Sequence, residues 1–195
     1  MIENHNDKIE RFRELLKGRL SEKRFYHSCM VSKEAVRLAE KYGGDVQKAE
    51  FAGLVHDIEK DTPKDVQLQT IEKYSIILDD VEKSAPKLLH ALSGAAVLKN
   101  EYNVTDTDVL NAVRYHTTAR AGMSLLEKII YLADYISADR DYEGVDNLRG
   151  TIHDSLEKGM DEALHYSINE LLLKNAPIHI DTVKARNQLV LAKYI

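Results

Sequence analysis

The sequence predicts an all-α fold, and three observations support this. Apolar residues recur at helical spacing along nearly the whole chain, and residues that cap helices precede most of these stretches. Only 3 prolines interrupt the 195 residues, and no strand-like alternation of useful length appears. The run SIIL at 75–78 is too short to predict a strand. We therefore expect one helical bundle spanning residues 1–195.

The first two helices are expected from apolar spacing and from a stop signal. Over residues 7–17 one face carries Ile9, Phe12, Leu15 and Leu16. Ser21 can cap a second helix that runs to about Tyr42, where Gly43-Gly44 ends it.

The next three helices follow shorter signals. Asp45 can cap a helix that ends near residues 56–57. Thr62-Pro63 begins another, with proline at the first helical position, where no N–H is needed. An apolar helix follows Pro86 and carries Leu88, Leu89, Leu92, Val97 and Leu98.

Capping signals also mark the helices of the second half. The signals and the helices they begin are Thr105 to Asp108 (toward His116), Ser124 to Glu127 (the apolar run to residue 137), Asp154 to Glu157 (to Lys174) and Asp181 (to Leu191). The helices over 145–195 are expected to pack on a core over residues 21–140.

Composition excludes several classes of protein. The net charge is −5 and no long basic tract is present, so the sequence gives no indication of nucleic-acid binding. Its one cysteine, Cys29, excludes an intrachain disulfide framework and is expected as a small buried residue rather than a nucleophile. No signal peptide or membrane span is predicted, so we expect a cytoplasmic protein.

Six residues with metal-ligand chemistry lie at or near the ends of predicted helices, each beside apolar neighbours: His27, His56, Asp57, His90, His116 and Asp134. A single buried histidine is more often a satisfied core residue than a ligand. A carboxylate such as Asp134, within IIYLADYI, needs a cation or several hydrogen-bond donors if it is buried.

Together the six residues resemble the H…HD…D signature of the HD-domain metal-dependent phosphohydrolases, in the branch that holds two metals. The resemblance extends to the YqeK family through RFYH at 24–27, GLVHDIEKD at 53–61, LLHALSGA at 88–95, RYHTTAR at 114–120, SLLEKIIYLADYIS at 124–137 and IHIDTVKARN at 178–187. It implies a single HD domain and hydrolysis of dinucleoside tetraphosphates, chiefly diadenosine tetraphosphate, symmetrically into two nucleoside diphosphates. A dinucleoside polyphosphate or nucleoside diphosphate is thus the expected ligand.

The chain departs from this family pattern at positions outside the presumed ligands. Ser28-Cys29 follows the first histidine where a threonine-led run is usual, and Ala119 stands in place of a common glycine. Ala138-Asp139 precedes Arg140 where Pro-Asn is expected. These differences bear on the surroundings of the site and on substrate preference.

The expected mechanism depends on Asp57, because a carboxylate can bridge two cations and an imidazole cannot. We expect one metal on His27, His56, Asp57 and Asp134, and a second on Asp57, His90 and His116. A bridging hydroxide would attack phosphorus, and a nucleoside diphosphate leaves without a strong general acid. The thiolate-free ligand set suits iron, manganese or cobalt, and the family resemblance implies iron.

Cationic residues near these ligands are candidates for phosphate binding: Arg24, Lys60, Arg120 and Arg140. Lys60 is also predicted, with Asp57, to be catalytic. Each of these cations could instead be a solvated surface charge. Thr117 and Thr118 could donate hydroxyls to a phosphate or bond their own backbone. The family resemblance suggests that His179, Thr182 and Arg186 close over the nucleotide, and the alternative is a terminal helix that only packs on the domain.

Three other functions stay open from the sequence. The chain could be another HD-type nucleotidase or phosphodiesterase, or a di-iron oxygenase with a related six-ligand site. A non-enzymatic nucleotide-binding module would be expected to lack ligands, and all six are present. The oligomeric state is open, a homodimer included.

Overall fold

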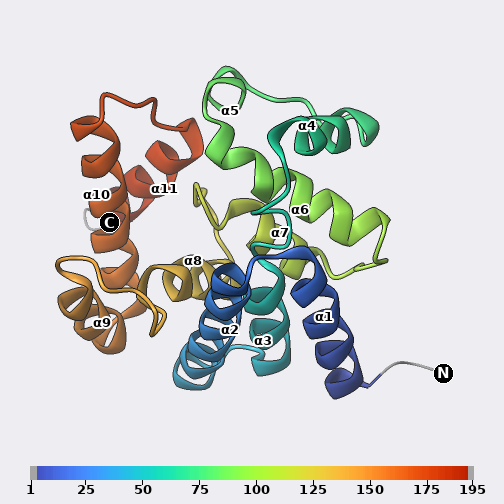
Figure 1. Cartoon of the computed structure of the whole chain (residues 1–195). Helices are drawn as coiled ribbons and strands as arrows, with labels where there is room; N and C mark the ends of the chain where they lie inside the picture. The colour runs from blue at the N-terminus through green and yellow to red at the C-terminus, as the bar shows by residue number, and fades with distance from the viewer. Residues whose placement is uncertain (1–3, 193–195) are drawn as a thin grey trace.

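The computed structural model describes residues 4–192, which form helices and connecting loops without a strand (Figure 1). The predicted all-α class is confirmed, whereas the predicted domain limits of 1–195 extend beyond the described residues at both ends. The elements are α1 (His5–Arg19), α2 (Glu22–Tyr42), α3 (Val46–Val55), α4 (Lys64–Lys73), α5 (Asp80–Ser84), the 3-10 turn η1 (Pro86–Leu88), α6 (Leu89–Asn100), α7 (Thr107–Tyr115), α8 (Leu125–Ile136), α9 (Val145–Asp154), α10 (Leu156–Leu173) and α11 (Ile180–Leu191).

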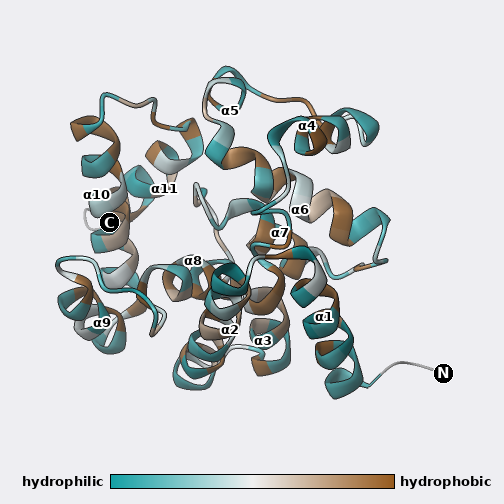
Figure 2. Cartoon of the chain, viewed as in Figure 1, coloured by the Kyte–Doolittle hydropathy of each residue, from teal (hydrophilic) through white to brown (hydrophobic). Residues whose placement is uncertain are grey.

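Helix α8 lies at the centre of the packing. It contacts α2, α3 and α7 on one side and α9 and α10 on the other, so it joins the ligand-bearing helices to the C-terminal ones. Its residues Ile129, Ile130, Tyr131 and Leu132 are fully buried. Figure 2 shows hydrophobic and hydrophilic residues on different faces of α1 and α2, as expected for helices that bury one side.

Helices α2 and α3 approach closely where Gly53 lies. A Cβ atom at Gly53 would come within 2.8 Å of the Ser32 Cα atom, so only glycine permits this spacing. The Ser32 hydroxyl also donates to the carbonyl of Glu50, 2.8 Å away. This contact brings the C-terminal end of α3, where His56 follows, against the helix that carries His27.

Several helix starts differ from the predicted ones in the N-terminal half. Ser21 occupies the N-cap position of α2 but makes no capping bond, because its hydroxyl donates to Asp61 at 2.7 Å instead. Pro63 is the N-cap of α4 rather than its first residue. Asp106, not Thr105, caps α7, since its side chain accepts from two backbone amides.

Two starts in the C-terminal part are also shifted. Ser155 caps α10, while Asp154 ends the preceding helix α9. His179 caps α11, two residues before the predicted Asp181. The short helix α5 was not predicted, because its capping box of Asp79 and Glu82 begins only five residues of helix, too few to show apolar periodicity.

No helix within residues 4–192 is both long enough and apolar enough to cross a bilayer.

Candidate metal centre

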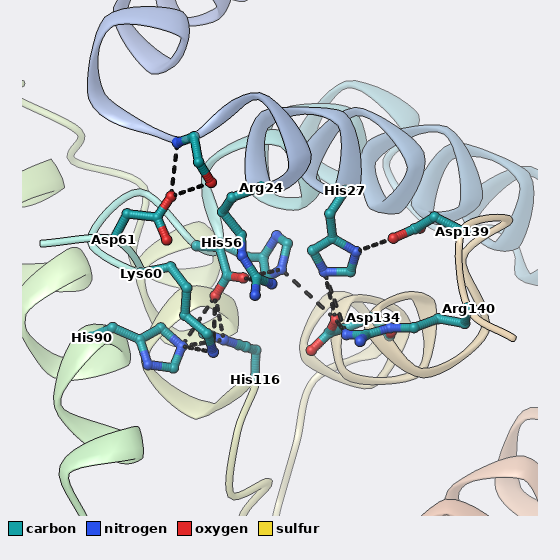
Figure 3. A network of polar contacts seen from close by, with 12 residues as sticks. Arg24, His27, His56, Lys60, Asp61, His90, His116, Asp134, Asp139 and Arg140 are labelled. Atoms are coloured by element: carbon teal, nitrogen blue, oxygen red, sulfur yellow. Dashed lines mark hydrogen bonds and ion pairs between the residues drawn. The ribbon is translucent and has the colours of Figure 1, made fainter. Parts of the chain in front are cut away.

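The six predicted ligand residues converge on one region, although they lie on five different helices or in the turns that follow them; Figure 3 labels all of them except Asp57. His27 lies on α2 and His90 on α6, while His56-Asp57 follows α3 and His116 follows α7. The side chain of Asp134, on α8, is 20% exposed, and the other five residues are buried.

Two histidines gather around Asp134. Its Oδ1 atom lies 2.9 Å from Nε2 of His27 and 3.9 Å from Nε2 of His56. One ligand atom from each of these three residues fits within 4.8 Å of the others. This spacing is suitable for a metal ion.

Asp57 joins the second group of ligands to the first. Its Oδ1 atom lies 3.1 Å from Nε2 of His90 and 3.4 Å from Nε2 of His116. Its Oδ2 atom lies 3.6 Å from Nε2 of His56. The two carboxylate oxygens therefore face different histidines, as a ligand shared between two metal ions requires.

Hydrogen bonds at helix ends set the orientation of two imidazoles. Nδ1–H of His56 donates to the Gly53 carbonyl and Nδ1–H of His116 to the Val113 carbonyl, each at 2.7 Å. Both histidines are C-cap residues, where carbonyls of the last helical turn lack amide partners. With the proton on Nδ1, the Nε2 lone pair of each ring faces the cluster.

The third orienting contact comes from Asp139, one of the positions at which the chain departs from the family pattern. Its Oδ2 atom lies 2.8 Å from Nδ1 of His27. Asp139 and His27 are 112 positions apart, so sequence spacing gave no signal for this pair.

Burial and charge set the protonation of the cluster. Burial lowers the pKa of His56 and of His90 to about 4, so both rings are neutral at pH 7. For Asp57, burial opposes ionisation, but His56, His116, His90 and Lys60 together hold its pKa well below the ordinary value. The pKa of Asp134 is likewise lowered against the effect of burial, by His27, His56 and Arg140.

The residues present fit a pair of metal ions. Nε2 of His56 and Oδ1 of Asp57 are buried without a hydrogen-bond partner, and buried polar atoms of this kind need an explanation. The predicted ligand set consists of imidazoles and ionised carboxylates without a thiolate, which suits iron, manganese or cobalt. Cys29 is half-buried, and burial raises the pKa of its thiol, so it is not poised as a thiolate nucleophile.

Three of the predicted cations lie at this cluster. Nη1 of Arg24 donates to Oδ2 of Asp57 at 2.9 Å. Nζ of Lys60 lies 3.2 Å from Nε2 of His90 and 3.7 Å from Oδ1 of Asp57. Arg140 forms an ion pair with Asp134 and donates from Nε to its carbonyl at 2.7 Å. The side chains of Arg24 and Lys60 are about 30% exposed, so both reach from the buried ligands to solvent.

Arg120 lies outside this group. It forms two hydrogen bonds with the buried Glu127, at 2.7 and 3.1 Å, and its guanidinium stacks on Tyr115. The neighbouring Ala119 has φ of 55°, in the left-handed region that favours the glycine of the family pattern.

A cavity of about 390 Å³ adjoins the helix ends that carry His90 and His116. Thr117, Thr118, His179 and Thr182 line it, together with the segment 84–88 and residues of α10. The hydroxyl of Thr182 donates to the Thr118 carbonyl at 2.7 Å, and that of Thr118 donates to the next carbonyl. The buried hydroxyl of Thr117 has no hydrogen-bond partner. The half-buried Arg186 lies one turn further along α11 and does not line this cavity.

His179 also joins a third cluster of possible ligands, with Asp79 and Glu82 of the α5 capping box. Its Nδ1 accepts a hydrogen bond from the amide of Asp181 at 3.1 Å, and its Nε2 lies 3.0 Å from Oδ2 of Asp79. Glu82 is already paired with Arg114 at 2.5 Å. Both ring nitrogens are thus engaged, and we interpret this cluster as an ion-pair network.

Comparison with known proteins agrees with the geometry. The model of the HD domain family matches residues 24–139, a segment that contains all six predicted ligand residues. The chain belongs to the HD domain family.

Other HD domain proteins resemble the chain over nearly its full length. A protein of Halalkalibacterium halodurans is 41% identical over 91% of this chain and 95% of its own, and one of Bacillus subtilis is 38% identical over 90% and 94%. Both are described as symmetrical bis(5'-nucleosyl)-tetraphosphatases. A crystal structure from Clostridium acetobutylicum superposes with a TM-score of 0.91 at 39% identity, covering 94% of this chain and 97% of that one. It is described as a predicted HD superfamily hydrolase involved in NAD metabolism. The predicted resemblance to the YqeK family is confirmed.

Proposed function

We propose that this HD domain protein hydrolyses diadenosine tetraphosphate symmetrically into two molecules of ADP, at a centre of two metal ions. The observation that carries the proposal is the position of Asp57, whose two oxygens face His56 on one side and His90 and His116 on the other. The relatives described as symmetrical tetraphosphatases, matched over 90% of the chain or more, support the choice of substrate.

The six ligand residues would hold the two ions, with Asp57 shared between them. Bound there, the ions would supply an acidified water near neutral pH and would neutralise charge that develops on the phosphoryl oxygens. The protonation states of the ligands favour metal binding, because His56 and His90 are neutral at pH 7 and Asp57 is ionised.

Arg24, Lys60 and Arg140 would bind the polyphosphate chain. In the described structure they neutralise Asp57 and Asp134, which metal ions would do instead in the loaded enzyme. Their guanidinium and ammonium groups would then be free to pair with phosphate oxygens at the mouth of the site. We assign no general acid, because a nucleoside diphosphate is already a good leaving group.

The nucleoside end of the substrate would occupy the cavity of about 390 Å³ beside His116. Of the threonines there, Thr117 is the better phosphate donor, because the hydroxyl protons of Thr118 and Thr182 are already donated to carbonyls. His179, Arg120 and Arg186 remain predicted nucleotide contacts. Arg120 would have to leave Glu127 to reach a phosphate.

We further propose that the native metal is iron and that the enzyme acts in the cytoplasm. The nitrogen- and oxygen-rich ligand set supports iron without distinguishing it from manganese or cobalt. A single cysteine is consistent with a reducing compartment.

The test is metal analysis of the purified protein together with product identification from diadenosine tetraphosphate. We expect about two metal ions per chain and ADP as the sole nucleotide product. In ¹⁸O-labelled water, one of the two ADP molecules should carry the label, because one P–O bond forms with water as one anhydride bond breaks. Formation of AMP and ATP, or turnover that survives complete removal of metal by a chelator, would overturn the proposal. Oxygen consumption without anhydride cleavage would favour the oxygenase alternative.

A further inference from the structure

The loop after α8 brings two side chains to the ligands around Asp134. Asp139 reaches His27 and Arg140 reaches Asp134, so adjacent residues of one short loop contact both ligands (Figure 3). Of the six predicted ligands, His27 and Asp134 are therefore contacted directly by side chains of this loop.

The loop itself is fixed from α9. Arg149 donates to three backbone carbonyls, those of Ile136 at 3.1 Å, Ser137 at 2.9 Å and Arg140 at 2.8 Å. These carbonyls flank Asp139 on both sides. The hydrogen bonds of the Arg149 guanidinium thus fix the backbone of the loop that carries Asp139.

The contact between Asp139 and His27 has the geometry of a carboxylate that orients a histidine. Oδ2 of Asp139 lies 2.8 Å from Nδ1 of His27, where it can accept a hydrogen bond from Nδ1–H, and Nε2 on the other side of the ring lies 2.9 Å from Oδ1 of Asp134. His27 is 4% exposed, so few water molecules could replace the carboxylate as acceptor. Unlike His56 and His116, which use carbonyls of their own helix ends, His27 lies inside α2, where backbone carbonyls are already paired.

We propose that Asp139 is a positioning residue for metal binding, which holds His27 in the tautomer and rotation that present Nε2 to the ion. This inference rests on the proposed metal centre and extends it to a residue outside the ligand set. Partners of this kind typically change metal affinity by about 10–100-fold when they are removed. Asparagine, which the family pattern has here, could accept the same hydrogen bond through its amide oxygen.

The experiment compares Asp139→Ala, Asp139→Asn and the control Asp141→Ala, whose carboxylate is exposed two residues further along the chain. Binding of Mn²⁺ to the metal-free proteins is followed by the electron paramagnetic resonance signal of the free ion. Long-range ¹H–¹⁵N correlations of the imidazoles, recorded without metal, report the tautomer of His27 directly.

We expect Asp139→Ala to weaken the binding of one Mn²⁺ by about 10-fold or more and to lose the Nδ1–H tautomer of His27. Asp139→Asn should keep that tautomer and lose less affinity, and Asp141→Ala should behave as the unmodified chain. Unchanged Mn²⁺ affinity and an unchanged His27 tautomer in Asp139→Ala would overturn this inference and leave the proposed function standing. Equal losses of Mn²⁺ affinity in the alanine and asparagine variants would do the same. Failure of the unmodified chain to bind Mn²⁺ or another divalent ion would overturn the proposed function as well.

Discussion

Asp57 Oδ1 lies 3.1 Å from Nε2 of His90, although Asp57 lies in the turn after α3, His90 lies on α6, and the two are 33 positions apart. The other oxygen of Asp57 faces His56 and Arg24. The two oxygens of this carboxylate therefore face ligands of both proposed metal positions, so the loss of its charge should affect both positions.

Replacement of Asp57 by asparagine keeps the size of the side chain but removes its charge. We expect Asp57→Asn to retain less than one metal ion per chain and to lose activity by about 1000-fold or more, since the ions supply several kcal/mol of charge stabilisation. Metal analysis and steady-state rates measure this. The control is Asp65→Asn, an exposed carboxylate in the first turn of α4. Full turnover by Asp57→Asn would contradict the assigned site.

Lys60 tests the phosphate-binding role separately from metal binding. Lys60→Met should lower kcat/KM by about 10- to 150-fold, the equivalent of losing one charged hydrogen bond of about 1.5–3 kcal/mol. The metal content should not change, because the ammonium is a neighbour of His90 and Asp57 rather than a ligand. Lys64→Met, on the exposed start of α4, is the matched control. An unaltered kcat/KM in Lys60→Met would show that Lys60 does not bind the substrate.

The buried histidines predict how stability depends on pH in the metal-free protein. His56 and His90 titrate at about 4 when folded, whereas an unfolded histidine titrates near 6.5. Between these values the unfolded chain binds more protons, so the free energy of unfolding falls as the pH falls. The slope should approach about 1.4 kcal/mol per pH unit for each histidine. The lowered pKa of Asp57 adds a further loss below about pH 4.

Urea unfolding in the presence of a chelator, from pH 7 to pH 5, measures this slope. His90→Gln should lower the slope of the unfolding free energy against pH by up to about 1.4 kcal/mol per pH unit, because one of the two buried histidines is removed. His165→Gln, which changes a half-exposed histidine on α10, should leave it as it is. A slope that is the same in all three proteins would show that these rings do not stay neutral on folding.

Gly53 and Gly18 should respond in opposite directions to alanine. A methyl group at Gly53 would meet the backbone of Ser32 at 2.8 Å, so Gly53→Ala should destabilise the fold by about 1–3 kcal/mol. Gly18 lies in α1 with no atom within 4 Å of the added Cβ, and there alanine should stabilise by about 0.5–1 kcal/mol. Thermal unfolding distinguishes the two, and a tolerated Gly53→Ala would mean that α2 and α3 can separate at low cost.

Sequence alone was sufficient for the fold class and for the chemical identity of the six ligand candidates. Apolar periodicity reports which face of a helix is buried, and it predicted the central helix around Ile129 and Ile130. The sequence predicted helix starts less well, because the side chains that accept the capping hydrogen bonds are those of Asp106 and Ser155 rather than of their neighbours. Several adjacent residues can cap a helix, and the choice depends on which backbone amides they meet.

Only the tertiary structure decided which residues act on one another. The pairing of Asp139 with His27, and of Arg120 with Glu127 instead of the cluster, depends on how a loop and two helices pack. Such contacts join positions far apart in the chain, and no local pattern encodes the distance between them. Periodicity fixes the faces of single helices, whereas the placement of charges around Asp57 follows from the packing of all of them at once.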